Sequence, residues 1–268
     1  MAACRVAGLC RRTWQYKPRK KRDDSALRAA ILRIAEQRRR FGQDRIYLML
    51  RREGWKDNVK RVRRIYREEG LSLRLKRRKK SSAVVRVPME AASRPNHTWS
   101  MDFVHDRLAS GRALKCLTIV DEFTRESLGI EVDFGLPAAR VSRVLDGLIE
   151  LRGKPAAIRS DNGPEFAGNW MDAWAYQRGV KLAFIQPGKP TQNAYIESFN
   201  GRFREECLNE NQFQTIVEAQ VVIETWRKDY NEGRPHGSLN GLTPSEFAER
   251  HTTNEQAKLP LVPQLDLA

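Results

Sequence analysis

Three acidic residues in the second half of the chain have types and surroundings that suit metal-dependent chemistry. Asp102 lies within "WSMDFV", an alternating segment typical of a strand, where a carboxylate is costly unless it is paired or binds a metal. Asp161 opens "SDNGPEF" directly after a short apolar segment, and Glu197 lies in "NAYIESFNGRFREEC", which has helical spacing. Carboxylates around one point can hold a pair of Mg²⁺ ions that activate a water or a 3′-hydroxyl and stabilise the leaving oxygen of a phosphodiester.

Each of these acids also has a simpler interpretation. Asp102 alone fits a strand-end or surface acid, Asp-Asn-Gly-Pro is good turn chemistry without any ligand, and Glu197 alone fits an ordinary amphipathic helix. Glu165 is a rival carboxylate close to Asp161. The sequence offers no Cys/His cluster with zinc spacing, no Gly-rich phosphate loop and no nucleophile–base arrangement of its four histidines. Together, the acids therefore favour a metal-dependent enzyme that acts on nucleic acid.

The helix around Glu197 has an apolar stripe and a polar stripe side by side. The apolar positions form a narrow arc that we expect to face the core: Ile196, Phe199, Phe203 and Cys207. A second arc beside it carries Asn193, Glu197, Asn200 and Arg204. Glu197 is therefore expected at the edge of the buried face, where it can approach the ends of the strands. Lys189 in the preceding loop, Asn193 and Arg204 are the candidates for positioning a DNA strand.

The elements that must position these residues form an α/β pattern. Three strands with short connections are predicted at 97–108, 113–123 and 127–134, as an antiparallel meander. A helix follows from about Pro137 to Gly153, then strands at 156–160 and 180–185 around a helix at 168–179. Two more helices are predicted at about 191–210 and 215–231. The order predicts a mixed sheet flanked by helices, with Asp102 on the opposite face from Trp99 and Met101.

The N-terminal region carries all the excess positive charge of the chain. Residues 1–86 contain 29 Lys/Arg and 8 Asp/Glu, whereas residues 87–268 contain 20 and 25. This asymmetry indicates a polyanionic partner, most often nucleic acid, although a basic tail that only aids solubility remains an alternative. Three short helices are predicted, the first capped by Asp24 or Ser25, the second by Asp44 and the third by Asn58.

Such a unit fits a helix-turn-helix module whose last helix enters the DNA major groove. The cations on the outer face of that helix are Lys60, Arg63, Arg64 and Arg67, and a solvated basic face is the alternative interpretation. Residues 74–95 are dense in Lys, Arg and Ser and are expected to be a linker. The chain has no apolar run long enough to span a membrane and no signal-peptide pattern, and its four cysteines are far apart. We expect reduced cysteines and a cytoplasmic protein.

The combined motifs resemble those of a known family. "WSMDFV", "SDNGPEF", "PGKPTQNAYIESFNGRFREECLN" and "YNEGRPHGSLNGLTPSEFA" resemble the integrase-like core of bacterial insertion-sequence transposases, particularly the insertion-sequence three family, over about residues 5–250. Asp161 and Glu197 are separated by 35 residues, the spacing of that family, and Arg204 stands where the family has Lys or Arg. Two positions depart from the pattern: "FGQDRI", where the family commonly has a Tyr-Gly-Tyr-Arg-Arg-like stretch, and Gly237, where it commonly has Ser.

The resemblance implies an RNase H-like fold and a DDE active site of Asp102, Asp161 and Glu197. It implies two Mg²⁺ ions, for which Mn²⁺ can substitute, cleavage at element ends to free 3′-hydroxyls, and strand transfer. The expected organisation is a basic DNA-binding module at 1–73, a linker at 74–95, a catalytic core at 96–250 and a tail at 251–268.

The expected partners are DNA, further copies of the chain on DNA, and the product of an upstream reading frame that the family joins by frameshifting. The alternative is a catalytically silent DNA-binding regulator, or a partial subunit of such a fusion. An RNase H-type nuclease would share the metal chemistry but not the spacing of the acids.

Overall fold

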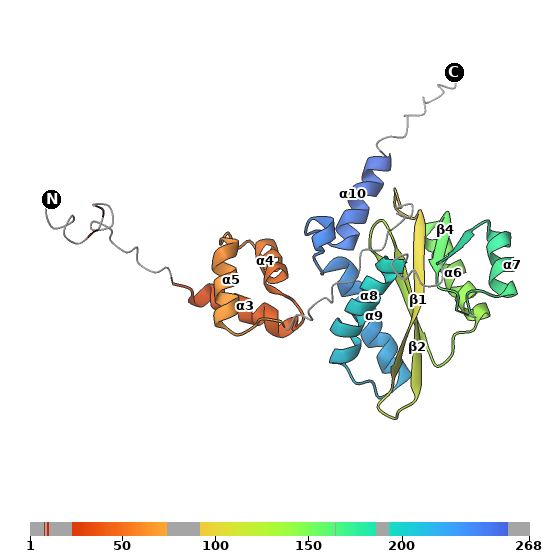
Figure 1. Ribbon diagram of the computed structural model, residues 1–268, viewed down its shortest axis with the longest axis horizontal. Coiled ribbons are helices and arrows are strands. Elements are labelled where there is room, and N and C mark those ends of the chain that lie inside the picture. Colours follow the sequence, from red (N-terminus) through yellow and green to blue (C-terminus); the bar gives the residue numbers. More distant parts are fainter. Residues whose placement is uncertain are drawn as a thin grey trace, which may run out of the picture. The chain divides into compact units, whose positions relative to one another are not determined.

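The computed structural model describes residues 23–73, 92–163, 165–185 and 193–256, with side chains up to His251, together with Gly8 and Cys10. The chain divides into two compact units, Met1–Leu73 and Arg74–Ala268 (Figure 1). Most of the predicted linker, the loop that contains Lys189 and residues 257–268 lie outside the described residues. Within the described part of the chain, no helix is both long and apolar enough to cross a membrane.

The first unit is a three-helix bundle, as the sequence predicts. Helix α3 (Ser25–Gln37), helix α4 (Gln43–Arg52) and helix α5 (Val59–Glu68) surround one apolar core. The buried side chains come from all three helices and the connection after α3, and they include Leu27, Ile31, Ile34, Phe41, Ile46, Leu50, Val62, Ile65 and Tyr66. Their helical spacing is what makes each helix amphipathic and allows the three to close around the core.

The helix caps of this unit agree only in part with the predictions. Asn58 caps α5, and its side chain accepts a hydrogen bond from the backbone N–H of Lys60 at 2.8 Å. The prediction for Asp44 is wrong, because α4 begins after Gly42 and Asp44 lies in its first turn. Asp24 occupies the cap position of α3 without capping it, because its carboxylate is bonded to arginines of α5.

The second unit is built on a five-stranded mixed sheet in the order β3-β2-β1-β4-β5. Strands β1 (Thr98–Arg107), β2 (Ala113–Asp121) and β3 (Ser127–Asp133) form the predicted antiparallel meander. Strands β4 (Ala157–Ser160) and β5 (Lys181–Phe184) add parallel to β1 on its other side. β1 is therefore the central strand, and β4 enters the sheet directly beside it.

Helices cover both faces of this sheet. Helix α6 (Ala138–Arg152) and helix α7 (Asn169–Arg178) lie on one side, and helix α8 (Ala194–Glu206) and helix α9 (Ile216–Glu232) lie on the other (Figure 1). Trp99 and Met101 of β1 are buried in the cluster with α6 and α7, whereas Val104 is buried in the cluster with α8 and α9. The predicted alternation is confirmed, and it places Asp102 on the α8 face.

A last helix, α10 (Pro244–Gln256), follows a short 3₁₀ turn (Gly237–Leu239) and was not predicted from the sequence. Its start has a recognisable signal. The backbone N–H of Thr243 donates to Glu246 Oε2 at 2.8 Å, and the N–H of Glu246 donates to Thr243 Oγ1 at 3.2 Å. This is a capping box with proline at the first helical position, so "TPSE" could have identified the helix.

Candidate active site and nucleic-acid interface

Asp102 is half-buried in the middle of the central strand and is held by three neighbours. Its carboxylate accepts hydrogen bonds from the backbone N–H of Phe103 and from Asn200 Nδ2, both at 2.8 Å. Thr118, which lies opposite Asp102 on β2, donates to Asn200 Oδ1 at 2.9 Å and so orients that amide. The helical spacing placed Asn200 on the polar stripe of α8, but neither it nor Thr118 was among the predicted site residues.

Asp161 follows directly after β4, the strand that pairs with β1 beside Asp102. In the parallel ladder Trp99 lies opposite Ile158 and Ser100 lies opposite Arg159. Continuing this register by two residues brings Asp161, directly after β4, level with Asp102. The carboxylate of Asp161 accepts the backbone N–H of Gly163 at 3.1 Å, and a Cβ added at Gly163 would lie 3.1 Å from the same oxygen. Glycine therefore permits this close approach of backbone to carboxylate.

Helix α8 carries Glu197 to this site in its first turn. The apolar arc is buried as predicted: Ile196, Phe199, Phe203 and Cys207. Glu197 itself is exposed, so the expectation that it lies at the edge of the buried face needs correction. The physical reason is that Asn200, one turn later, takes the position against Asp102, whereas the side chain of Glu197 lies in solvent.

The pKa of Asp102 is affected by the other two acids. Burial raises the pKa of Asp102 to about 6, and the charges of Asp161 and Glu197 contribute to this rise. The hydrogen bonds from Phe103 and Asn200 oppose it. The structure thus places Asp161 and Glu197 within electrostatic range of Asp102. It does not draw them into a ligand cluster, since no three His, Cys, Asp or Glu side chains among the described residues could hold a metal ion.

The other predicted residues near the site differ in their surroundings. Arg204 is exposed on α8, and its guanidinium donates to the backbone carbonyl of His105 at 2.8 Å. Asn193 is only 3% exposed, and its buried Oδ1 meets no hydrogen-bond partner among the residues that the structure describes. Lys189 lies outside the described residues. The rival carboxylate Glu165 is bonded to Lys115 of β2.

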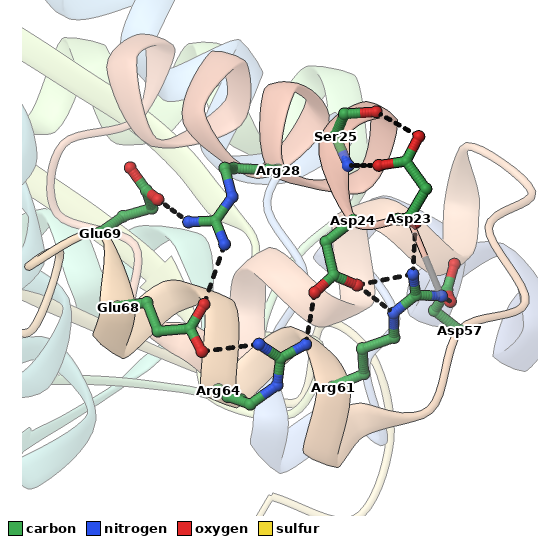
Figure 2. A network of polar contacts seen from close by, with 9 residues as sticks. All are labelled: Asp23, Asp24, Ser25, Arg28, Asp57, Arg61, Arg64, Glu68 and Glu69. Carbon is green, nitrogen blue, oxygen red and sulfur yellow. Dashed lines mark hydrogen bonds and ion pairs between the residues drawn. The ribbon is translucent and has the colours of Figure 1, made fainter. Parts of the chain in front are cut away.

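In the helical unit, ion pairs occupy part of the basic face that was predicted to contact DNA. Figure 2 shows the network between α3 and α5. Arg64 donates to Asp24 at 2.5 Å and to Glu68 at 2.6 Å. Arg61, which was not among the predicted contacts, bonds Asp24 at 2.7 Å and Asp57 at 2.6 Å. Asp24 therefore links α3 to α5 through two arginines, and the side chain of Arg64 remains 47% exposed within this network.

The other predicted cations of α5 take part in fewer ion pairs than Arg64 does. Lys60 is exposed, and it donates to Asn58 from its backbone N–H and not from its ammonium group. Arg67 is exposed and its Nε donates to the backbone carbonyl of Arg63 at 3.1 Å. Arg63 bonds Asp44 at 2.9 Å, a pair whose side chains are 43% and 67% exposed. Water can compete for so exposed a pair, and so can a phosphate group.

Comparisons with known proteins agree with this architecture. Models described as integrase core domains match residues 92–190 and 178–244, and a model described as an HTH-like domain matches residues 21–80. An uncharacterized 31.7 kDa protein of insertion element IS407 from Burkholderia multivorans is 48% identical over 95% of this chain and 92% of that protein. The transposase InsF of insertion sequence IS3A from Escherichia coli is 26% identical over 93% of this chain and 94% of that protein.

A solved structure supports the fold. The simian T-cell lymphotropic virus intasome, determined with the PP2A regulatory subunit B56 gamma, contains a chain that matches with a TM-score of 0.56 at 15% identity. The match covers 89% of this chain and 79% of that one. At this identity the similarity establishes an RNase H-like integrase fold and nothing finer. With the sequence relatives, it completes the assignment: the chain belongs to the family of insertion-element transposases with an integrase core domain.

Proposed function

We propose that the chain is a DDE-type transposase in which Asp102, Asp161 and Glu197 hold two divalent cations. The ions are Mg²⁺, with Mn²⁺ able to substitute, because carboxylate oxygens are the ligands that such hard cations prefer. When bound, the ions activate the attacking oxygen and stabilise the leaving one. In the first reaction water attacks a phosphodiester at the element end, the bond between phosphorus and O3′ breaks, and a 3′-hydroxyl is freed. In the second, that hydroxyl attacks target DNA and displaces another O3′.

The observation that carries this proposal is the arrangement of the acids: Asp161 lies level with Asp102 across the β1–β4 ladder, and Asn200, one turn after Glu197 on α8, bonds Asp102. The pKa of Asp102 reflects this arrangement. Burial and the charges of two further acids raise it to about 6, so ionising all three groups in the absence of a counter-charge is unfavourable. A divalent cation relieves that repulsion. The donor set therefore fits the proposed ions, although the side chains must still turn to form a ligand cluster. Glu197 can do so readily because its side chain is exposed.

The other residues of the site position the reactants. Asn200, held by Thr118, fixes one oxygen of Asp102 and leaves Asp102 a limited choice of orientations. Arg204 offers a cation on the same stripe of α8 as Glu197 for a phosphate of the DNA strand. Lys189 and Asn193 remain proposed contacts of that strand. For Asn193, this requires its buried amide to become accessible when DNA binds.

In this proposal the helical unit binds the phosphate backbone of DNA, independently of the base sequence. Lys60, Arg63 and Arg67 would contact phosphates, whereas the bonds of Arg64 to Asp24 and Glu68 favour a structural role. The proposed organisation is binding by residues 1–73 and catalysis by residues 96–250. Two element ends must meet, so further copies of the chain on DNA, and the upstream-frame product, are the proposed protein partners.

The test is nicking and strand joining of a supercoiled plasmid by the purified chain, with Mg²⁺ or Mn²⁺ and with a chelator. Glu197→Gln should bind DNA as the unaltered chain does but lose nicking and joining. Glu205→Gln is the matched control, because Glu205 is an exposed glutamate on the same helix. Full activity of Glu197→Gln would remove Glu197 from the site. DNA binding without metal-dependent nicking by the unaltered chain would favour the silent regulator.

A further inference from the structure

The residues after Asp161 fold back onto the sheet next to Asp102. The Phe166 ring is 1% exposed and stacks on the Phe103 ring, with centroids 4.7 Å apart and planes 4° from parallel. The backbone N–H groups of Phe166 and Ala167 both donate to the carbonyl of Gly163 at 2.9 Å. Residues 161–163 and 165–167, called the Asp161 turn below, are thus hydrogen-bonded to each other, and Phe166 anchors the far end on β1.

Phe103 connects this turn to the neighbouring carboxylate. Its backbone N–H donates to Asp102 Oδ1, while its ring receives Phe166 from the Asp161 turn. Phe103 of the central strand therefore contacts both the Asp102 carboxylate and the turn that begins at Asp161. A shift of the turn relative to Phe103 would change the distance between Asp102 and Asp161. A pair of metal ions about 4 Å apart would require that distance to stay constant.

An ion pair reinforces the same contact from β2. Lys115 Nζ bonds the carboxylate of Glu165 and also lies 3.9 Å from the centroid of the Phe103 ring. The side chains of Lys115 and Glu165 are 16% and 29% exposed, so the pair is partly withdrawn from water. Lys115 holds the pKa of Glu165 below its usual range, which keeps that carboxylate ionised. A lysine bound to both Glu165 and Phe103 restrains the turn where it meets the strand.

We infer that Lys115 and Glu165 are positioning residues for the transposase reaction: they dock the Asp161 turn on β1 and so set the place of Asp161 relative to Asp102. Glu165 then acts through Asp161 and is not itself a metal ligand. This inference rests on the proposed function, because it assigns Asp161 to the metal-binding carboxylates. It also gives the second half of the "SDNGPEF" motif a purpose.

The first measurement is the Mn²⁺ concentration that gives half-maximal plasmid nicking. Glu165→Gln and Lys115→Met should each raise it, and lower the nicking rate by roughly 10- to 100-fold, as expected for a carboxylate misplaced by about 1 Å. The exchanged pair Lys115→Glu with Glu165→Lys should recover part of both losses. Arg140→Gln, which breaks the Arg140–Glu131 pair of the same unit, is the matched control and should change neither. Unaltered metal dependence in both single variants would overturn the inference.

The second measurement is hydrogen exchange of the Phe166 and Ala167 amides in the full chain without metal. Both amides should exchange faster in Glu165→Gln and Lys115→Met, and at the original rate in the Arg140→Gln control. Equal exchange rates in all variants would show that the ion pair does not dock the turn. This readout needs no catalysis, so an inactive unaltered chain would count against the proposed function while exchange still decides the docking.

Discussion

Replacing Asp102 by asparagine should make the protein more stable at neutral pH while it abolishes nicking and joining. Asp102 is half-buried beside two other acids, and this raises its pKa from 3.8 to about 6. Folding must therefore ionise a carboxylate in a place that resists ionisation. Asparagine has nearly the same shape and carries no charge, so the variant removes this cost.

The size of the effect follows from the pKa. The rise from 3.8 to about 6 corresponds to about 3 kcal/mol at pH 7, since each pH unit is worth about 1.4 kcal/mol. Solvent screens a half-buried group, and the hydrogen bonds must rearrange. Asn200 can turn its amide so that its oxygen accepts from the introduced asparagine amide, with Thr118 accepting from Asn200. We therefore expect a gain of about 1–2 kcal/mol.

The pH dependence gives the sign of the effect. A carboxyl group whose pKa is raised in the folded state binds more protons when folded than when unfolded between pH 3.8 and about 6. The stability of the unaltered chain therefore falls as pH rises through this window. The advantage of Asp102→Asn should be complete above about pH 6 and absent below 3.8. Its control is Asp133→Asn, a carboxylate at the end of β3.

The assay is urea unfolding followed by tryptophan fluorescence from about pH 4 to about pH 8, a range that spans the titration window of Asp102, with a chelator present. Trp99 is fully buried in the second unit, Arg74–Ala268, and reports on the unfolding of that unit. Adding Mn²⁺ should stabilise the unaltered chain and not the variant. A destabilised Asp102→Asn protein, or a gain that does not change with pH, would refute the argument that Asp102 is held ionised at a cost.

Four further substitutions test the rest of the structure. Asn200→Leu removes a donor to Asp102, so the acidic limb of the nicking profile at fixed Mn²⁺ should move up by about 1 pH unit; an unmoved limb would contradict the role of this amide. Arg64→Gln should lower the melting temperature of the helical unit and leave the salt dependence of DNA binding unchanged. Lys60→Gln should leave the melting temperature unchanged and reduce the slope of log affinity against log salt concentration by about 1. The opposite pattern would return Arg64 to the DNA interface. Arg234→Met should destabilise the unit Arg74–Ala268 by about 2–3 kcal/mol in urea unfolding, because it removes two hydrogen bonds, at 2.5 and 2.7 Å, that the largely buried Glu206 carboxylate accepts; a loss below about 0.5 kcal/mol would show that this pair is dispensable.

The sequence by itself determined the order of the helices and strands and, for most of them, which face is buried. Both are local properties of the chain. Alternation along 98–107 separates Trp99 from Asp102, and helical spacing along 194–206 buries Ile196 and Phe199. The meander, the mixed sheet with flanking helices and the three-helix unit follow from such patterns. The central position of β1 does not, because it depends on the pairing of β4 with β1. The α10 helix had a readable signal in "TPSE", although it was not predicted.

The partners of the polar side chains were decided only by the tertiary structure. Asn200 meets Asp102 across 98 residues of sequence, Glu165 meets Lys115 across 50, and Arg64 meets Asp24 across 40. Periodicity says which side of an element a residue occupies, but it does not say which distant group the residue will meet there. For that reason the sequence located the three acids and the basic helix. The structure alone showed that Asn200 takes the place against Asp102, that Glu165 is held by Lys115, and that Arg64 is used to fasten two helices together.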